Sequence, residues 1–256
     1  MMAQDRNFDD LAERFNTRIY DTSKGQLRLE ILKQDLLSVT ETNSLTVWDA
    51  GCGAGQISCW LAAQGHRLTL CDISEKLLQQ AQQQFAVSGL DADFHHASIQ
   101  QLSPQLNAFD LVICHAVLEW LATPLETLKL VLERVKPGGY LSLMFYNRNA
   151  MVYKNVLRGG WRLEPILNDR YIGAGNKLSP PYPQYPHEIT AFLQNQGFEI
   201  IRHSGIRVFS DYLNSDTRNQ TNEQELLALE HQYCRMPVYR DMGRYVHLLT
   251  EKISPD

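Results

Sequence analysis

The chain contains 256 residues, with 24 lysines and arginines against 29 aspartates and glutamates, which gives a formal net charge of −5. Hydrophobic residues make up 44% and charged residues 21%, the composition of a globular protein long enough to bury a core. No apolar run approaches the roughly 20 residues of a membrane span, and the first residues lack the apolar stretch of a signal peptide. The five cysteines include no C-x-x-C pair. This pattern disfavours a disulfide scaffold or a structural zinc site, and it predicts a cytoplasmic protein.

The charges are unevenly distributed along the chain. Residues 1–147 carry 11 basic against 17 acidic side chains, whereas residues 148–256 carry 13 against 12. Six of those bases lie within 148–177, against two acids. Charge alone slightly favours an ordinary solvated face there over a flap that binds a polyanion.

Strand and helix patterns alternate from residue 45 to residue 147. The alternation predicts a parallel sheet with helices on both faces. A helix over 118–135, broken or restarted at Pro124, is expected to stop at Lys136-Pro-Gly-Gly139. The other elements expected here are strands at 45–50, 67–71, 92–96, 110–114 and 140–145 and helices at 57–64 and 74–88.

The alternation lapses after Asn147. Glycines and a proline-rich stretch predict that 148–186 is an insertion, mostly loop with one short helix. Regular structure is expected again as a helix at 187–196 ended by Gly197, a strand at 198–203, a helix at 222–234 and a strand at 245–250. We expect a single domain, made of a helical cap (1–44), a cofactor-binding core (45–147), the insertion (148–186) and the last part of the sheet (187–256).

A glycine-rich loop, Asp49-Ala-Gly-Cys-Gly-Ala-Gly55, follows the first predicted strand and opens a helix. Glycines let the backbone turn sharply and approach a ligand at the carboxyl edge of the sheet. The G-x-G-x-G spacing departs from the dinucleotide pattern G-x-G-x-x-G, which requires glycine where Gln56 stands. Asp72 ends the second predicted strand, where a carboxylate can accept both hydroxyls of a ribose. This order of strand, loop, helix, strand and acid indicates a nucleoside-binding site far more specifically than the loop alone does.

Over residues 45–147 the sequence resembles the class I S-adenosylmethionine-dependent methyltransferases. Besides the loop and Asp72, the matching pieces are Ser98-Ile-Gln100, Phe109 to Trp120 and Val135 to Gly139. The resemblance implies a Rossmann-like class I methyltransferase fold. Such a fold has a seven-stranded, mostly parallel sheet with helices on both faces, here with a small insertion after the fifth strand. The implied cofactor is S-adenosyl-L-methionine.

The same resemblance implies which residues bind that cofactor. Ser98 stands where the family often has an aspartate beside the adenine. Arg28 either pairs with the methionine carboxylate, since a guanidinium binds a carboxylate bidentately, or is an ordinary exposed base. His115 either borders the cofactor or is a core histidine. The implied cofactor residues are Arg28, Gly51, Cys52, Gly53, Asp72, Ile73, Ile99, Gln100 and His115.

Further segments, both inside and outside this core, resemble the bacterial tRNA 5-carboxymethoxyuridine methyltransferases, so this resemblance extends across nearly the whole chain. That family methylates the carboxylate of 5-carboxymethoxyuridine at the tRNA wobble position. The implied partner is a tRNA anticodon stem-loop carrying that nucleoside, and we expect no membrane partner and a monomer or weak homodimer. The matching segments are 5–15, 19–20, 24–28, 115–120, 142–147, 205–209 and 243–247.

Methylation of a carboxylate requires little catalytic machinery. Carboxyl groups are ionised at neutral pH, so the reaction needs positioning and a cationic clamp and no general base. The candidates around the modified uracil and its carboxylate are Tyr20, Tyr146, Arg207 and Arg244, although both arginines could instead form structural pairs. Three aromatic residues, Tyr153, Trp161 and Tyr171, either stack on anticodon bases or pack a flap.

Three other functions compete with this interpretation. The first is a methyltransferase of the same fold that acts on a small carboxylic acid or a quinone precursor. The second is an RNA-binding protein without a cofactor, which the intact glycine loop and Asp72 disfavour. The third is a nicotinamide dehydrogenase, which the missing glycine at position 56 disfavours.

Overall fold

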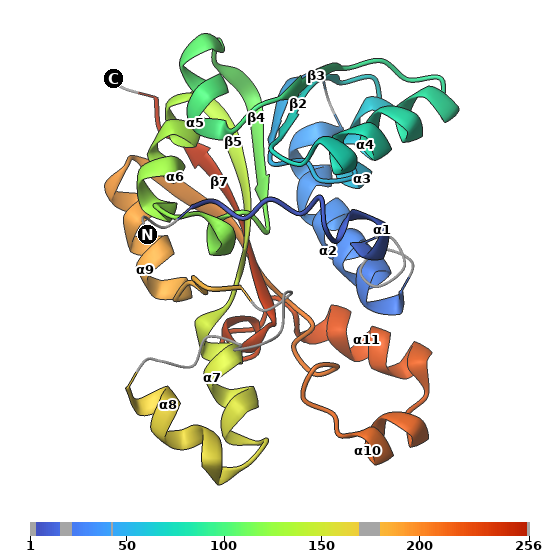
Figure 1. Ribbon diagram of the computed structural model, residues 1–256, viewed down its shortest axis with the longest axis vertical. Helices are drawn as coiled ribbons and strands as arrows, with labels where there is room; N and C mark the ends of the chain where they lie inside the picture. Colours follow the sequence, from blue (N-terminus) through green and yellow to red (C-terminus); the bar gives the residue numbers. More distant parts are fainter. Residues whose placement is uncertain (1–3, 16–21, 42, 169–179, 255–256) are drawn as a thin grey trace.

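The computed structural model describes residues 4–15, 22–41, 43–168 and 180–254, and their strands form a single sheet (Figure 1). The strand order is β3-β2-β1-β4-β5-β7-β6. β7 runs antiparallel to both of its neighbours, whereas the pairs among β1 to β5 are parallel. The seven-stranded, mostly parallel sheet is therefore confirmed. The strands are β1 Thr46–Ala50, β2 Arg67–Asp72, β3 Asp93–His96, β4 Phe109–His115, β5 Val135–Tyr146, β6 Phe198–Ile206 and β7 Tyr245–Lys252.

Helices cover both faces of this sheet, and four more lie at one end of the molecule (Figure 1). One face carries α5 (Ile99–Leu102), α6 (Pro124–Glu133) and α9 (Pro186–Asn195), and the other carries α2 (Ser23–Thr40), α3 (Gln56–Ala62) and α4 (Glu75–Val87). The end helices are α7 (Arg148–Val156), α8 (Leu163–Leu167), α10 (Ser215–Gln220) and α11 (Glu223–Tyr233), and α1 spans Ala12–Phe15. Single 3-10 turns span Ser103–Gln105, Leu118–Trp120, Gly160–Arg162 and Arg240–Met242. No helix within the described ranges is long and apolar enough to cross a membrane.

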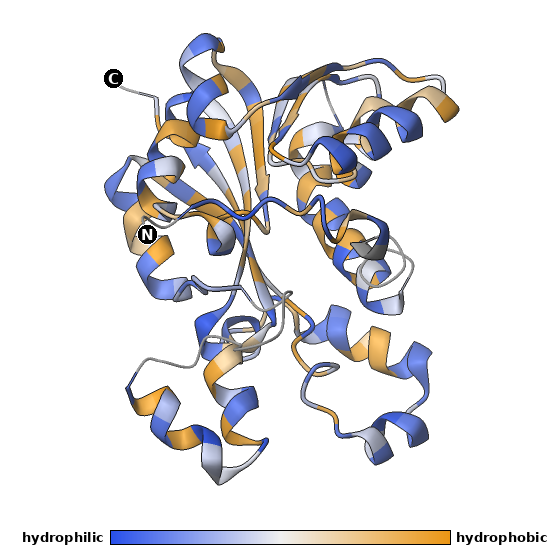
Figure 2. Cartoon of the chain, viewed as in Figure 1, coloured by the Kyte–Doolittle hydropathy of each residue, from blue (hydrophilic) through white to orange (hydrophobic). Residues whose placement is uncertain are grey.

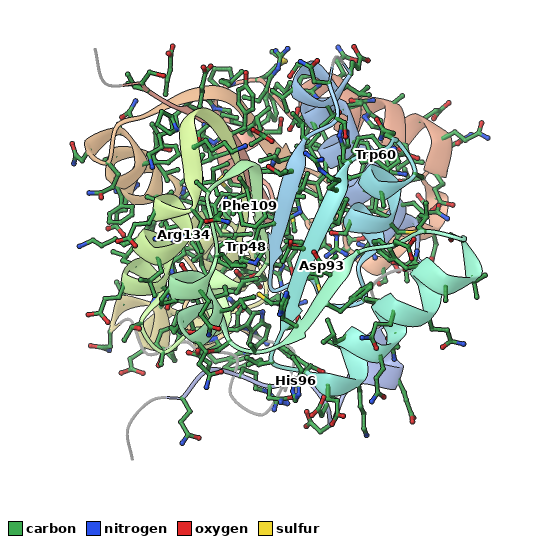
Figure 3. All side chains as sticks on the ribbon, turned by 90° about the horizontal axis from the view of Figure 1, so that it is seen from above. Trp48, Trp60, Asp93, His96, Phe109 and Arg134 are labelled. Carbon is green, nitrogen blue, oxygen red and sulfur yellow. The ribbon has the colours of Figure 1, made fainter. Side chains whose placement is uncertain are left out.

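Two apolar clusters, one on each face, hold the layers together. Apolar residues concentrate in the strands and on the helix faces that meet them (Figure 2). Trp48 of β1 is completely buried and stacks on Phe109 of β4, with ring centroids 6.2 Å apart, on the side of the sheet opposite Trp60 (Figure 3). Because each large apolar side chain stabilises the fold by about 1.5–3 kcal/mol when buried, the two clusters fix the carboxyl edge on which the site is built.

The β5 strand begins earlier than the sequence predicts. Phe109 pairs with Val135 and Leu111 with Tyr140, so residues 136–139 bulge out of a strand that continues on both sides. Gly138 has φ +70° in this bulge. The end of a helix and a β-bulge both use glycine in the left-handed region, and the sequence pattern does not distinguish the two structures. The predicted restart of the helix at Pro124 is confirmed, because α6 begins there. The stretch before it forms only the 3-10 turn at Leu118–Trp120, and α6 ends at Glu133.

The insertion also differs from its prediction. Its described residues hold two α-helices, α7 and α8, and a 3-10 turn instead of one short helix. Asn147 begins α7 by accepting a hydrogen bond from the backbone N–H of Asn149, at 2.9 Å. The sequence analysis also missed α5 and α10, which are only four and six residues long. Residues 169–179, the middle of the insertion, lie outside the described ranges.

Candidate active site

A pocket opens at the carboxyl ends of β1, β2 and β4, the edge where parallel sheets bind their ligands. Its wall is built from the glycine loop after β1, the residues that end β2 and β4, and one face of α2. Within the described ranges no cluster of His, Cys, Asp and Glu could hold a metal ion. All nine residues that the sequence analysis assigns to a cofactor line this pocket: Arg28, Gly51, Cys52, Gly53, Asp72, Ile73, Ile99, Gln100 and His115.

The glycine loop folds back onto β2. The backbone N–H groups of Gly51 and Cys52 both donate to the Cys71 carbonyl oxygen, each at 2.9 Å. Gly51 has φ +87°, and a Cβ atom there would lie 2.6 Å from Cγ2 of Val117. The loop therefore passes so close to the segment after β4 that only glycine fits at this position.

Asp72 presents a carboxylate to the pocket. The backbone N–H of Gly53 donates to its Oδ2 at 2.8 Å, and that of Ser74 donates to its Oδ1 at 2.7 Å. Burial raises the pKa of Asp72, and these two hydrogen bonds oppose the rise. A carboxylate has about four acceptor positions, so both oxygens can also accept the hydroxyls of a ribose.

Two glutamine side chains of the pocket lining each carry a buried oxygen. Oε1 of Gln56 and Oε1 of Gln100 have no hydrogen-bond partner among the described residues. The Nε2 group of Gln100 is held by Asp5 at 2.9 Å and by Thr127 at 3.0 Å, so its oxygen is fixed in place as an acceptor. A buried polar atom without a partner is costly, and an adenine amino group would satisfy the Gln100 oxygen. The lining thus fits S-adenosylmethionine.

The N-terminal segment adds pocket residues that the sequence analysis did not assign. It crosses from the side of α6 to the side of α2 (Figure 1). Asp5 accepts a hydrogen bond from the Ala122 backbone N–H at 2.8 Å, and the ring of Phe8 meets that of Trp120 edge-on at 4.8 Å. Asp5, Phe8 and Trp120 all line the pocket. Their signal in the sequence is the match of residues 5–15 and 115–120 to the family, which indicates importance without indicating a role.

Asp49 is a second carboxyl group in the pocket wall, at the end of β1. It is buried, and the hydroxyl of Ser58 donates to its Oδ2 at 2.6 Å. Burial raises its pKa to about 7. Its charge will therefore respond to a cation placed in the pocket, since a nearby positive charge favours the ionised form.

A cluster of basic and aromatic side chains adjoins this pocket. Tyr245 lines the pocket, and its ring meets that of Tyr146 edge-on at 5.4 Å. The guanidinium carbon of Arg207 lies 5.3 Å from the Tyr245 ring centroid, and that of Arg244 lies 4.4 Å from the Tyr146 centroid. The structure thus brings together three of the four predicted substrate residues, Tyr146, Arg207 and Arg244. The fourth, Tyr20, lies outside the described residues.

One buried carboxylate, Asp211, lies at the centre of this cationic cluster. Its oxygens are 2.8 Å from Lys24 Nζ, 3.6 Å from Arg207 Nη2 and 3.5 Å from Arg244 Nε. Burial opposes ionisation of Asp211, but the charges of Arg207, Lys154 and Arg244 hold its pKa well below the ordinary value. Burial also lowers the pKa of Lys154, to about 8. One carboxylate faces four basic groups, so the cluster keeps an excess of positive charge for an anionic ligand.

The loop that presents Arg207 and Asp211 is held by Glu230 of α11. The fully buried carboxylate of Glu230 accepts hydrogen bonds from the backbone N–H groups of Val208, Phe209 and Ser210, at 2.6, 3.1 and 2.7 Å. Arg207 has φ +62°, in the left-handed region that a bulky residue adopts only where surrounding contacts impose it. The sequence analysis missed both Asp211 and Glu230.

The aromatic candidates of the insertion are placed unevenly. Tyr153 of α7 packs edge-on against Tyr212, at 5.4 Å, next to the cationic cluster. Trp161 is 70% exposed and lies under the guanidinium of Arg162, whose carbon is 4.3 Å from its ring centroid. Tyr171 lies outside the described residues.

Solved structures with the same fold are numerous, and they show the fold alone. The magnesium protoporphyrin IX methyltransferase of Synechocystis PCC 6803, crystallised with bound SAH, has a TM-score of 0.61 at 20% identity, over 96% of this chain and 95% of its own. The cyclase SpnF has a TM-score of 0.63 at 16% identity over 99% of both chains. A cyclase and a methyltransferase share this architecture, so the reaction must be argued from the site.

Sequence relatives are more specific. Residues 48–143 match the methyltransferase domain family. A ubiquinone biosynthesis O-methyltransferase of Aromatoleum aromaticum is 35% identical over 47% of this chain and 52% of its own. The tRNA 5-carboxymethoxyuridine methyltransferase of Escherichia coli K12 is 39% identical over 97% of both chains. That match extends beyond the cofactor core to the N-terminal segment and the cationic cluster, and the protein therefore belongs to the tRNA 5-carboxymethoxyuridine methyltransferase family.

Proposed function

We propose that this protein transfers the methyl group of S-adenosyl-L-methionine to the carboxylate of 5-carboxymethoxyuridine at the tRNA wobble position, which forms 5-methoxycarbonylmethoxyuridine. The observation that carries the proposal is the position of the cationic cluster. A half-buried site with an excess of positive charge adjoins a nucleoside-binding pocket, and Tyr245 belongs to both. The Escherichia coli relative is named for this reaction and is similar over the whole chain.

Different pocket residues would bind different parts of the cofactor. Asp72 would hold the ribose hydroxyls, Gln100 the adenine and Arg28 the methionine carboxylate. The glycine loop would let the backbone approach the methionine part. When bound, S-adenosylmethionine supplies an electrophilic methyl group on a sulfonium centre.

The cationic cluster would hold the substrate. Arg207 and Arg244 each offer several N–H donors to a carboxylate, and Asp211 occupies only part of that capacity. Stacking on Tyr245 and Tyr146 restricts the two guanidinium groups, so little rotational freedom remains to be lost on binding. An ionised carboxylate needs no proton removed before it attacks, so orientation is the main contribution that these residues make.

The proposed partner is the anticodon stem-loop of tRNA, and the end helices beside the cluster would contact it. The six basic residues of 148–177 would attract the negatively charged phosphates. Exposed aromatic residues such as Trp161 offer surfaces on which unstacked bases can stack. A small free carboxylic acid would need none of this surface.

The test begins with nucleoside mass spectrometry of tRNA from a strain that lacks the gene. Restoring the gene should convert the accumulated free acid to its methyl ester. Purified protein should perform the same conversion on that tRNA, and Arg244→Met should lower the rate at least tenfold with unchanged affinity for S-adenosylhomocysteine. Lys129→Met, an exposed base on α6 far from the cluster, is the matched control. If the nucleoside profile is the same with and without the gene, the proposal is wrong and a small-acid methyltransferase takes its place.

A further inference from the structure

A chain of hydrogen bonds runs from the pocket wall through the sheet to α2. His115 Nε2 lies 2.8 Å from Ser142 Oγ, and the same oxygen lies 2.8 Å from His247 Nε2. His247 Nδ1 lies 2.8 Å from Asp35 Oδ2. Arg235 closes the chain by donating to Asp35 Oδ1 from Nη2 at 2.7 Å and from Nε at 3.0 Å. We call the side chains of Ser142, His247 and Asp35 the relay.

The relay is completely shielded from water. Ser142, His247 and Asp35 are each 0% exposed. The sheet register explains why they meet: His115 pairs with Met144 on β5, Met144 pairs with His247 on β7, and Ser142 lies two residues before Met144 on the same face. That face packs against α2, which carries Asp35. Four elements therefore hold the geometry of a single hydrogen-bonded chain.

The direction of the protons along the relay follows from the Asp35 end. Burial opposes ionisation of Asp35, but its hydrogen bonds with His247 and Arg235 hold its pKa at about 2. Asp35 is therefore a carboxylate that can only accept, and His247 Nδ1 must carry a hydrogen. In neutral His247 the Nε2 atom is then an acceptor, and it takes the single hydrogen of Ser142. The Ser142 oxygen can then only accept from His115, so Nε2 of His115 carries a hydrogen and Nδ1 carries a lone pair.

The charges that meet in the relay balance without an added proton on His247. The charges of Asp35 and Arg235 cancel, so a proton added to His247 would leave an uncompensated positive charge in the fully buried relay. The groups that face His115 add to the same effect, since Arg28 lines the pocket beside it. Burial and the charge of Arg28 hold the pKa of His115 well below its ordinary value.

We infer that the relay fixes His115 in the neutral tautomer whose Nδ1 presents a lone pair to the pocket, as an acceptor for the ammonium group of the cofactor's methionine part. The inference deepens the proposed function and rests on it for the identity of the ligand. Arg28 suits the methionine carboxylate, and a lone pair suits the ammonium group, so the two side chains would fix the amino-acid end in one orientation. The opposite tautomer would present an N–H and repel the ammonium group. Asp35, His247 and Ser142 are thus positioning residues that act through His115.

The tautomer is measured first, without ligand. Nitrogen-15 NMR of labelled histidines distinguishes a protonated from an unprotonated ring nitrogen, and His115→Gln identifies the His115 signals among the eight histidines. The inference requires an unprotonated Nδ1 and a protonated Nε2 in the unmodified protein at neutral pH. A protonated Nδ1 would overturn it, whatever the ligand proves to be.

The second measurement compares the calorimetric affinities of S-adenosylhomocysteine and its analogue without the amino group. The unmodified protein should bind S-adenosylhomocysteine at least tenfold more tightly. Ser142→Ala should reduce that ratio at least threefold and allow both tautomers, whereas Ser142→Thr, which keeps the hydroxyl, should restore both properties. Ser103→Ala removes another buried, hydrogen-bonded hydroxyl away from the pocket and should change neither.

The outcomes separate the two proposals. If Ser142→Ala weakens both ligands equally, the relay is merely structural and the inference fails. If S-adenosylhomocysteine does not bind the unmodified protein, the proposed function fails, and the assignment of His115 to the ammonium group fails with it. The ligand-free tautomer spectrum still decides whether the relay orders the protons as inferred.

Discussion

The glycine loop allows a direct test of how closely the chain is packed around the pocket. Gly51→Ala introduces two separate penalties. The first is the left-handed backbone, φ +87°, which costs a residue with a side chain about 1–2 kcal/mol. The second is the new Cβ atom, 2.6 Å from Cγ2 of Val117. Valine is stiff about its first side-chain torsion, so the backbone or the whole side chain must move, at about 1–3 kcal/mol.

Gly65→Ala is the matched control, because it shares only the first penalty. Gly65 has φ +89°, and a Cβ atom there would meet nothing within 4 Å. We expect Gly65→Ala to lower the free energy of unfolding by about 1–2 kcal/mol. Gly51→Ala should lower it by about 2–5 kcal/mol, the sum of the two penalties. Gly51→Ala should also weaken binding of S-adenosylhomocysteine at least tenfold, and Gly65→Ala should leave that affinity unchanged.

Urea unfolding and calorimetry measure both quantities, and a double-mutant cycle isolates the clash. Val117→Ala removes the atoms that a Cβ at position 51 would strike. It should therefore recover about 1–3 kcal/mol of stability in the Gly51→Ala background and recover none with Gly65→Ala. The reasoning is refuted if Gly51→Ala and Gly65→Ala cost the same within about 0.5 kcal/mol.

Three further predictions concern buried carboxyl groups. Asp211 has a lowered pKa, so its contribution to stability is present above about pH 4 and is lost at lower pH. In urea unfolding at pH 7, Asp211→Asn should lower the free energy of unfolding by about 3 kcal/mol. A difference between the two proteins that stays constant down to pH 3 would contradict this prediction. Burial raises the pKa of Glu119 to about 8. As the pH rises from about 4.5 to 8, the unmodified protein should therefore lose up to about 4 kcal/mol of stability relative to Glu119→Gln. The same difference in free energy of unfolding between the two proteins at pH 5 and at pH 8.5 would refute this prediction. Glu230→Gln should loosen the Arg207 loop and so raise the KM for tRNA severalfold, with unchanged affinity for S-adenosylhomocysteine. Steady-state kinetics measures the KM, and calorimetry measures the affinity.

The sheet could be predicted because each strand of the core is a short apolar run. All five predicted core strands form within a few residues of their expected places, and only β5 differs substantially, where the bulge at 136–139 resembles a stop. The insertion was harder to predict. Its second helix, α8, has no buried residue, and Leu167 is 84% exposed, so that helix carries almost no periodic signal.

The pocket and the cationic cluster also differ in how far the sequence predicts them. The nucleoside side of the pocket is encoded locally, since the glycine loop and Asp72 follow consecutive strands and parallel strands bring their carboxyl ends to one edge. The cationic cluster depends on tertiary structure instead. Lys24, Arg207, Asp211 and Arg244 come from α2, the loop after β6 and the residue before β7, and they meet only because β7 is inserted antiparallel between β5 and β6. The arginines could be suggested by resemblance, but the buried acid that balances them could not.

In the inferred arrangement, the same inserted strand would serve the cofactor as well. β7 carries His247 on the face toward α2 and Tyr245 at its beginning, so it contributes to the relay behind His115 and to the boundary between pocket and cluster. A shift of β7 by one residue would turn His247 to the opposite face and disconnect Ser142 from Asp35. If the proposed roles are right, the register of this strand would couple the orientation of the methyl donor to the position of the group that receives the methyl, and a lesion in β7 should impair both together.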